Sequence, residues 1–257
     1  MEIKSSHIMI TGANRGIGRA FAKTCAESGA HLHLIIRKKE VDLVKELEKA
    51  GAASVTVWIA DLSSPASVAD VIEKTSKLEV DLLFNNAGVL TGGLIEEQTV
   101  AEIDQIFQVN VTSVVQLTRA FIPRMLKRKR GKIVNNSSVS AIMHFPCAST
   151  YAASKAAVMA FTNCIKLELK NTGVSTLLLI TPGIKTRMFD DIANRYAKNF
   201  KVPEDSITPQ KYADMIKEAV LNDLEVLEPH GMTGVGLQIA KFLPPLFKWG
   251  VQSRFRR

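Results

Sequence analysis

The sequence has few cysteines, few aromatic residues and no long apolar run. Cys25, Cys147 and Cys164 are scattered and form no C-x-x-C pair, which argues against a disulfide framework and against a zinc site. No apolar run has the length that a membrane-spanning helix needs. Only six residues precede the first apolar stretch, so we find no signal-peptide pattern. These absences predict reduced thiols, no bound metal and a cytoplasmic location.

Acidic residues are also scarce relative to basic ones. The 257 residues include 33 Lys and Arg against 25 Asp and Glu, which gives a net charge of +8. Much of the excess lies at 127–130, where it complements the end of a predicted helix, and at 254–257. Aromatic residues, 6% of the chain, are not interleaved with basic ones as in a nucleic-acid groove. We therefore expect no nucleic-acid partner.

Short apolar runs alternate with longer helical patterns over most of the chain. The runs 7–11, 31–36, 54–60, 81–85, 132–136 and 175–180 are typical of buried strands, and helices are predicted at 16–28, 39–50, 65–77, 99–126 and 151–171. This alternation predicts an α/β fold, a single-domain Rossmann-type doubly wound parallel sheet with helices on both faces. In such a fold, ligands bind at the carboxyl ends of the strands.

A glycine-rich loop follows the first predicted strand. Gly12, Gly16 and Gly18 lie where this strand gives way to a helix, so they permit a tight turn. Backbone N–H groups at a helix N-terminus can bind a pyrophosphate. The spacing, G-x-x-x-G-x-G, differs from the common dinucleotide pattern G-x-G-x-x-G, but the position in the chain favours a nucleotide site.

A tyrosine and a lysine lie four residues apart, at Tyr151 and Lys155. In a helix this spacing brings both side chains onto one face. A free tyrosine, with a pKa of about 10, is a poor acid or base at neutral pH. A neighbouring ammonium group favours the phenolate, so we expect Lys155 to lower the pKa of Tyr151.

Several motifs occur together and in a fixed order. They are the glycine loop, the Asn-Asn-Ala-Gly segment at 85–88, Ser138, the Tyr151 and Lys155 pair, and Pro-Gly at 182–183. This combination resembles the short-chain dehydrogenase/reductase family in its compact single-domain form, over roughly residues 7 to 190. The resemblance implies a nicotinamide-dependent oxidoreductase.

The resemblance also implies catalytic roles. Tyr151 corresponds to the general acid of carbonyl reduction, and Lys155 to the group that lowers the tyrosine pKa and binds the nicotinamide ribose. Ser138, thirteen positions before Tyr151, would orient the substrate carbonyl. Ser137 is a competing candidate, although strand alternation turns it to the opposite face. Asn110 matches a helix asparagine that supports a water-mediated proton relay to the lysine.

The dinucleotide site implied by the resemblance draws on six segments of the chain. Asp61 would accept from the adenine amino group, and Ile184 and Thr186 would contact the nicotinamide carboxamide. The full set is Gly12, Asn14, Arg15, Gly16, Ile17, Gly18, Arg37, Asp61, Leu62, Asn86, Ala87, Gly88, Tyr151, Lys155, Pro182, Gly183, Ile184 and Thr186.

The end of the second predicted strand indicates which dinucleotide is bound. NAD-dependent proteins of this kind place an acid there to bind the ribose 2′-OH. Here Ile36 is followed by Arg37, whose guanidinium can bind a 2′-phosphate in a bidentate fork. Arg15 in the glycine loop can add a second cation, so the sequence predicts NADP(H).

The substrate region is predicted to be apolar. Apolar residues recur between 186 and 203, a segment that forms a substrate lid in this family, although the same stripe would also suit plain core packing. Met143, His144 and Phe145 are expected on the opposite wall. We assign residues 1–230 to one domain that includes the lid, and 231–257 to a C-terminal extension.

The C-terminal extension departs from the family's usual ending. Apolar and cationic residues mix at 239–249, so this segment can contact a membrane surface, pack over the substrate pocket, or pack against a neighbouring subunit. The departure puts the usual fatty-acyl-carrier reductase assignment in doubt.

These features predict an NADP(H)-dependent carbonyl reductase, reversible as an alcohol dehydrogenase, that acts on an apolar small molecule. The alternative is a catalytically silent NADP(H)-binding sensor or scaffold. The helices at 99–126 and 151–171 resemble the family's pairing surfaces, so we expect a homodimer or homotetramer.

Overall fold

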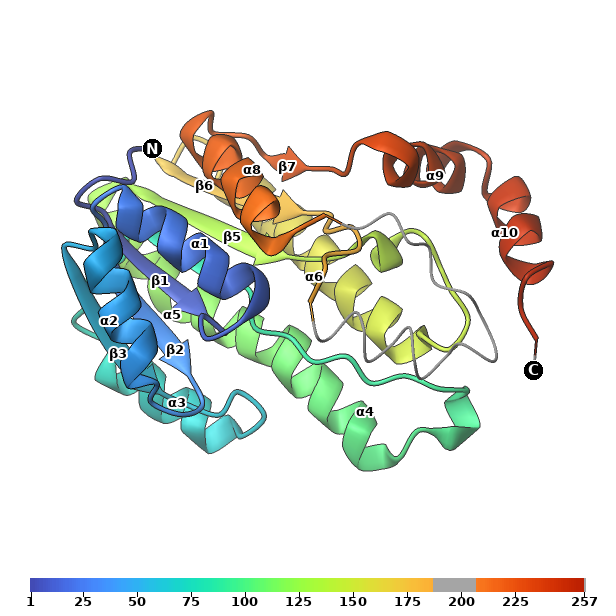
Figure 1. Cartoon of the computed structure of the whole chain (residues 1–257), viewed down its shortest axis with the longest axis horizontal. Helices are drawn as coiled ribbons and strands as arrows, with labels where there is room; N and C mark the ends of the chain where they lie inside the picture. Colours follow the sequence, from blue (N-terminus) through green and yellow to red (C-terminus); the bar gives the residue numbers. More distant parts are fainter. Residues whose placement is uncertain (187–206, 257) are drawn as a thin grey trace.

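The protein is built on a parallel sheet of seven strands, seen in a computed structural model that describes residues 1–186 and 207–256 (Figure 1). The strands lie in the order β3-β2-β1-β4-β5-β6-β7. Their bounds are β1 His7–Thr11, β2 His31–Ile36, β3 Ser54–Ile59, β4 Leu82–Asn85, β5 Gly131–Asn136, β6 Val174–Leu179 and β7 Val226–Leu227. The first six agree with the predicted strands to within a residue or two.

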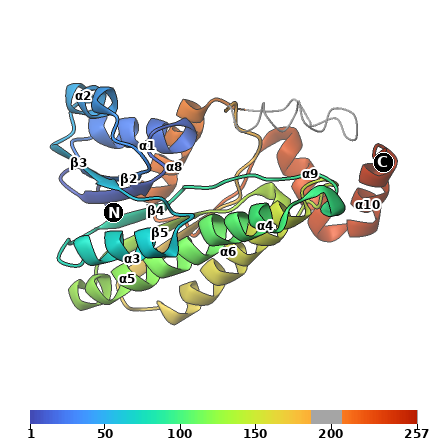
Figure 2. The same cartoon turned by 90° about the horizontal axis from the view of Figure 1, so that it is seen from below.

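Helices cover both faces of the sheet (Figure 2). One face carries α1 (Gly16–Glu27), α2 (Val41–Ala50) and α8 (Pro209–Leu221), and the other carries α3 (Pro65–Lys74), α5 (Ser113–Arg128) and α6 (Ser149–Glu168). Buried apolar residues fill the space on each side; Phe21 of α1, for example, packs edge-on against Phe84 of β4, with ring centroids 5.1 Å apart. The predicted doubly wound parallel fold is confirmed.

The strand order places a crevice at the carboxyl edge of the sheet. From β1 the chain proceeds first to β2 and β3 on one side, and then to β4, β5, β6 and β7 on the other. The loops after β1 and β4 therefore leave the sheet toward opposite faces. Ligands of doubly wound sheets bind at such a switch point.

The helix predicted at 99–126 is present, but a π-helical turn interrupts its regular α-helical pattern. The structure has α4 (Val100–Phe107), a π-helical turn (Gln108–Thr112) and then α5. Asn110, inside this turn, bonds to both the N–H and the carbonyl of Val89 on a neighbouring segment. These tertiary bonds support the wider turn, and the apolar periodicity of the sequence contains no sign of them.

The part of the chain beyond residue 206 contains elements that the sequence pattern did not predict. Thr208 caps α8, which has Pro209 in its first turn. Two further helices follow, α9 (Gly231–Phe242) and α10 (Pro244–Gln252). In the described ranges, no helix is both long and apolar enough to cross a membrane. The predicted lid lies almost entirely outside the described residues, which resume at 207.

Candidate active site

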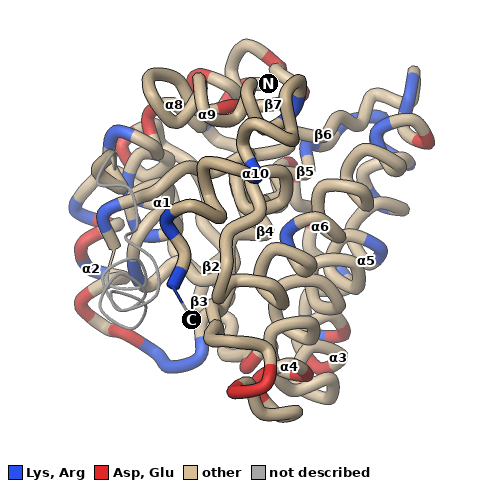
Figure 3. The backbone as a smooth tube through the Cα atoms, turned by 90° about the vertical axis from the view of Figure 1, so that its right-hand side faces the viewer, with Lys and Arg blue, Asp and Glu red and all other residues tan. Residues whose placement is uncertain are grey.

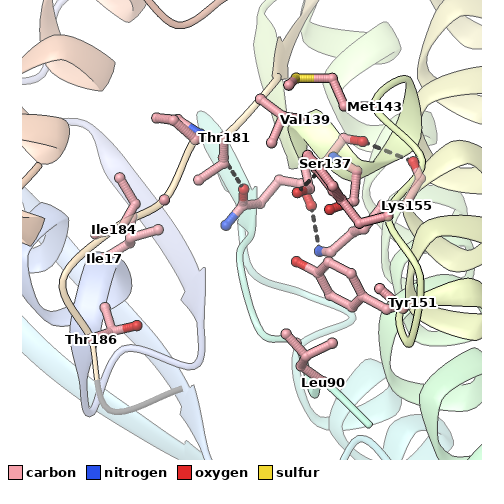
Figure 4. Close-up of a pocket in the computed structure, with 18 of the residues that line it drawn as sticks. Ile17, Leu90, Ser137, Val139, Met143, Tyr151, Lys155, Thr181, Ile184 and Thr186 are labelled. Atoms are coloured by element: carbon pink, nitrogen blue, oxygen red, sulfur yellow. Dashed lines mark hydrogen bonds between the residues drawn. The ribbon is translucent and has the colours of Figure 1, made fainter. Parts of the chain in front are cut away.

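A cavity of about 1050 Å³ lies at the carboxyl edge of the sheet. Figure 4 shows Ile17, Ile184 and Thr186 on one wall, and Tyr151, Lys155 and Leu90 on the other. The cavity extends from Arg37, just after β2, to α9 and α10. It is long enough to bring residues from both halves of the sheet to one ligand.

The glycine loop is held against the loop that follows β4. The Thr11 hydroxyl accepts hydrogen bonds from the backbone N–H groups of Asn86 and Ala87, both at 2.9 Å. A Cβ added to Gly12, which has φ +67°, would lie 3.0 Å from the Cα of Ala87. Only a residue without a side chain fits this approach, so the loop leaves its backbone open to the cavity.

Gly18 allows the first turn of α1 to pack on the glycine loop. A Cβ at this position would lie 2.4 Å from the carbonyl oxygen of Gly12 and 2.5 Å from Nδ2 of Asn86. Because the nearest atom belongs to the backbone, a side chain here must displace the loop itself. Gly18 therefore shapes the predicted dinucleotide site from behind.

We expect Gly18→Ala to weaken dinucleotide binding by roughly 10-fold or more, because 1.4 kcal/mol of distortion already accounts for a factor of ten. Fluorescence titration with NADPH measures the effect. Gly250→Ala is the matched control, since a Cβ at Gly250 meets no atom within 4 Å. Equal binding by the two variants would contradict this account of the loop.

Tyr151 and Lys155 lie on α6 and reach into the same space (Figure 4). The Lys155 ammonium nitrogen lies 5.6 Å from the centre of the Tyr151 ring and donates to the carbonyl oxygen of Asn136 at 2.7 Å. Asn136 ends β5, so the last carbonyl of this strand fixes the amine beside the phenol. The predicted pair is thus brought together in the cavity.

The expected lowering of the Tyr151 pKa is not found. Burial raises the pKa of Tyr151 to about 12, and a hydrogen bond with Ser138 opposes that rise only in part. Burial lowers the pKa of Lys155 to about 8. Spacing along a helix predicts which groups meet, but it does not show how far both groups are removed from water. At neutral pH the phenol keeps its proton, and it is therefore placed to donate one.

The two neighbouring serines have different partners. The Ser137 hydroxyl donates to the backbone carbonyl of Lys155 at 2.8 Å and so holds α6 against β5. The Ser138 hydroxyl bonds to Tyr151 and accepts from the N–H of Ser140. Both residues are buried, but Ser138 is the one that shares a hydrogen bond with the phenol. This geometry favours Ser138 over Ser137 as the substrate-orienting hydroxyl.

Asn110 is buried behind the cavity and does not line it. Its amide group donates to the Val89 carbonyl and to the Ser154 hydroxyl, and its oxygen accepts from the Val89 N–H. A Cβ on Gly88 would lie 3.4 Å from the Asn110 oxygen and 3.7 Å from the Lys155 nitrogen. Both side chains therefore reach Gly88, while the relay through Asn110 stays a prediction.

A polar chain behind the amine was not predicted. The Asn136 side chain donates to Asn86 at 3.2 Å and accepts from the Thr181 hydroxyl at 2.5 Å. Thr181 also shares a hydrogen bond with Tyr212 of α8. These bonds connect the ends of β4, β5 and β6. The sequence does place a polar residue at the carboxyl end of each of these buried strands, and this was the sign from which the chain of hydrogen bonds could have been predicted.

The end of the cavity nearest β2 carries two exposed cations. Arg15 directly precedes α1 without a side-chain capping bond, Arg37 follows β2, and both line the cavity. Asp61 also lines it; its carboxylate accepts from the N–H and hydroxyl of Ser63, and these bonds lower its pKa. Among the described lining residues Asp61 is the one acid, so this wall is predominantly cationic.

Most of the predicted cofactor residues line this one cavity. They are Gly12, Asn14, Arg15, Gly16, Ile17, Arg37, Asp61, Leu62, Asn86, Ala87, Gly88, Tyr151, Lys155, Pro182, Gly183, Ile184 and Thr186. Gly18 lies behind it. Three features fit a nicotinamide dinucleotide: the glycine loop, which has no room for a Cβ, the two exposed arginines and the buried Lys155 amine. These residues are therefore the ones that would hold it.

The wall beyond Tyr151 was predicted in part. Met143 and Phe145 line the cavity as expected. His144 does not line the cavity, because its side chain is exposed to solvent. Packing over the substrate pocket is one of the three alternatives for the C-terminal segment, and α9 and α10 do complete this wall. Their apolar lining residues include Met232, Val235, Ile239, Leu246, Phe247 and Trp249.

The sequence matches known proteins over most of its length. The family profile described as short chain dehydrogenase matches residues 6–197. Oxidoreductase UcpA of Escherichia coli O157:H7 is 34% identical over 223 residues, covering 86% of this chain and 84% of its own. A fatty acyl-CoA reductase of Acinetobacter baylyi is 30% identical, covering 89% of this chain and 77% of its own.

Solved structures show the same fold with nicotinamide dinucleotides. A short-chain dehydrogenase/reductase from Burkholderia phymatum in complex with NAD superposes with a TM-score of 0.84 at 27% identity, covering 96% of each chain. A short-chain dehydrogenase from Sphingobium yanoikuyae in complex with NADPH gives a TM-score of 0.78 at 26% identity, covering 98% and 97%. With the profile match, these similarities show that the chain belongs to the short-chain dehydrogenase/reductase family.

Proposed function

We propose that the protein is an NADP(H)-dependent carbonyl reductase, reversible as an alcohol dehydrogenase, that acts on an apolar small molecule. The observation that carries this proposal is the buried pair of Tyr151 and Lys155, with Ser138 bonded to the phenol, in the cavity that the glycine loop also lines. The bound nicotinamide would supply the hydride that reduces the carbonyl carbon.

The proton would come from this chain. The Tyr151 phenol donates its proton to the carbonyl oxygen as the alcohol forms, and the Ser138 hydroxyl stabilises the negative charge that develops there. The Lys155 ammonium, held by Asn136, stabilises the phenolate left behind. A tyrosine pKa of about 12 suits the donor role at neutral pH, since the proton stays in place until the oxygen becomes basic.

The cationic end of the cavity nearest β2 supports NADP(H) over NAD(H). A 2′-phosphate would face Arg37 and Arg15 without an opposing carboxylate at the end of β2. A guanidinium and a phosphate form strong bidentate hydrogen bonds.

We expect Arg37→Ala to weaken NADPH binding about 10- to 100-fold, the usual loss for a hydrogen bond between charged groups, and to leave NADH binding unchanged. Titration of both dinucleotides measures the two constants. Lys39→Ala removes the same charge from a nearby exposed residue that does not line the cavity. Tighter binding of NADH than of NADPH by the unaltered protein would overturn the preference.

The walls beyond Tyr151 support an apolar substrate. Met143 and Phe145 face the apolar side chains that α9 and α10 contribute. The A. baylyi relative, described as a fatty acyl-CoA reductase, bears the name of an enzyme with a long apolar substrate.

A panel of ketones, aldehydes and quinones tests the proposal, with NADPH oxidation as the measured signal. Turnover of an apolar carbonyl supports it, whereas tight NADPH binding without turnover of any compound supports the sensor.

We also propose a cytoplasmic homodimer or homotetramer that pairs through α4, α5 and α6. The exposure of Leu167 on α6 and Val100 on α4, at 72% and 74%, supports a contact between subunits there. Light scattering measures the mass; a monomer at micromolar concentration would contradict the pairing.

The cytoplasmic location is supported by the cysteines. Cys25, Cys147 and Cys164 are free thiols, which suits a reducing compartment.

A further inference from the structure

Helices α9 and α10 carry a large exposed apolar surface. Phe242, Met232 and Trp249 are 77%, 76% and 69% exposed, although side chains of this kind are usually covered. We name this surface the C-terminal apolar patch; it consists of Met232, Val235, Phe242, Leu243, Leu246 and Trp249. A contiguous patch of this kind indicates an interaction site.

The patch lies on the outer side of a helix whose inner side is packed. Leu237 and Ala240 of α9 are buried in a cluster with Met143 and Ile180. Met232, Val235 and Phe242 recur at helical spacing on the opposite side of α9. Both sides of α9 are therefore apolar, and the rest of the chain covers only one of them.

α10 packs against α9 and leaves much of its surface open. Its Phe247 packs edge-on against Phe145, with ring centroids 5.8 Å apart, and no residue of α10 is fully buried. Leu246 and Trp249, on either side of Phe247, stay more than half exposed. Figure 1 shows α10 at the extreme end of the molecule, beyond α9 and away from the sheet.

The segment that carries the patch has charges of one sign. Residues 231–257 contain five Lys and Arg and no Asp or Glu. Lys248 and Arg254 are exposed, and Lys241 is paired with Glu228. Figure 3 looks onto this end of the molecule and shows a basic residue at α10. Apolar side chains with cations and without acids suit an anionic lipid surface.

A second copy of the chain suits the patch less well. A two-fold contact brings the same surface of each subunit together, so the cations of one patch would face those of the other. The segment contributes no acid to balance them. Lipid headgroups supply both the negative charge and, just below it, the apolar layer.

The patch is continuous with the mouth of the cavity. Met232, Val235, Leu246 and Trp249 are more than half exposed and also line the cavity. A surface laid on the patch would therefore lie against the cavity entrance. An apolar compound could pass from that surface to Tyr151 without crossing water.

We propose that α9 and α10 dock the protein on an anionic membrane surface, with the cavity mouth against the lipid, so that the carbonyl substrate enters from the bilayer. The docking stands on the patch and its charge; the entry of substrate rests on the proposed reductase function.

The docking is measured with the full chain and phospholipid vesicles. Trp58→Phe leaves Trp249 as the one tryptophan, so its emission reports the patch directly. Vesicles of phosphatidylcholine with phosphatidylglycerol are expected to shift the emission to the blue and to sediment the protein. Pure phosphatidylcholine vesicles are expected to bind at least 10-fold more weakly.

Two variants separate the apolar and the electrostatic contributions. Phe242→Ser with Leu243→Ser removes exposed apolar side chains that do not line the cavity, and Lys248→Glu reverses one exposed charge. Each should weaken vesicle binding about 10-fold or more and leave the reduction of a water-soluble carbonyl unchanged. Val41→Ser and Lys45→Glu make the same kinds of change at exposed sites on α2, away from the patch and from the proposed pairing helices, and should bind as the unaltered protein does.

The outcomes distinguish the docking from the reductase activity. Vesicle binding without turnover of any carbonyl would support the docking and contradict the proposed function. Turnover without binding to anionic vesicles would overturn the docking. A dimer that dissociates on Phe242→Ser with Leu243→Ser, and that ignores vesicles, would assign the patch to a second copy and likewise overturn it.

Discussion

A Tyr151→Phe enzyme reduces carbonyl compounds about 10²- to 10⁴-fold more slowly than the unaltered enzyme, the usual contribution of a positioned general acid. The substitution removes one oxygen and keeps the ring, so the packing on α6 is retained. The remaining hydroxyls are aliphatic and poorer acids than a phenol: Ser137 donates to the Lys155 carbonyl, and Ser138 loses its bond with the phenol. The loss should appear in kcat, measured by NADPH oxidation under saturating substrate.

Two further measurements on the same variant show that the loss is chemical. The affinity for NADPH, measured by fluorescence titration, should change by less than about threefold, since the phenol makes no charge pair. The thermal midpoint should stay within a few degrees. If the affinity and kcat fell together, a collapse of the site would explain the loss, and the role of Tyr151 as a proton donor would be contradicted.

A Lys155→Met enzyme loses about 10³-fold in kcat/KM, because the phenolate that forms during reduction has no cation beside it. The pH dependence of the unaltered enzyme reports the same group. Burial lowers the pKa of Lys155 to about 8, so the amine is charged below pH 8 and loses its charge above it. We therefore expect kcat/KM for reduction to fall through a single ionisation near pH 8.

Lys155→Arg separates the charge from the rest of the side chain. A guanidinium stays protonated throughout this range. The variant should be slower than the unaltered enzyme, because its planar group fits poorly against the Asn136 carbonyl, but its rate should not fall near pH 8. A fall at the same pH in Lys155→Arg would assign the ionisation to another group.

The strands, the layers and the position of the cavity follow from local patterns in the sequence. β1 to β6 are short apolar runs bounded by polar residues, and the glycine loop at the end of β1 is visible without any structure. The pairing of Tyr151 with Lys155 follows from helical spacing alone. Such features depend on residues close together in the chain, which is why the sequence predicts them well.

The parts that failed depend on distant contacts. The π-helical turn is held by bonds between Asn110 and Val89, and the amine is held by Asn136, nineteen residues before it. The direction of the Tyr151 pKa shift was wrong because it depends on how much of the fold covers the phenol. Phe145 meets Phe247 across about a hundred residues, so no local pattern decides among the three alternatives for the C-terminal segment.

Single-turnover reduction of an apolar ketone, with NADPH that carries deuterium on the transferred position of the nicotinamide, tests the central claim most directly. The unaltered enzyme should place the label on the carbinol carbon in one fast phase. Tyr151→Phe, loaded with the same labelled NADPH, should place it there at least about 100-fold more slowly. Transfer at equal rates in both enzymes, or no transfer in either, would contradict the account.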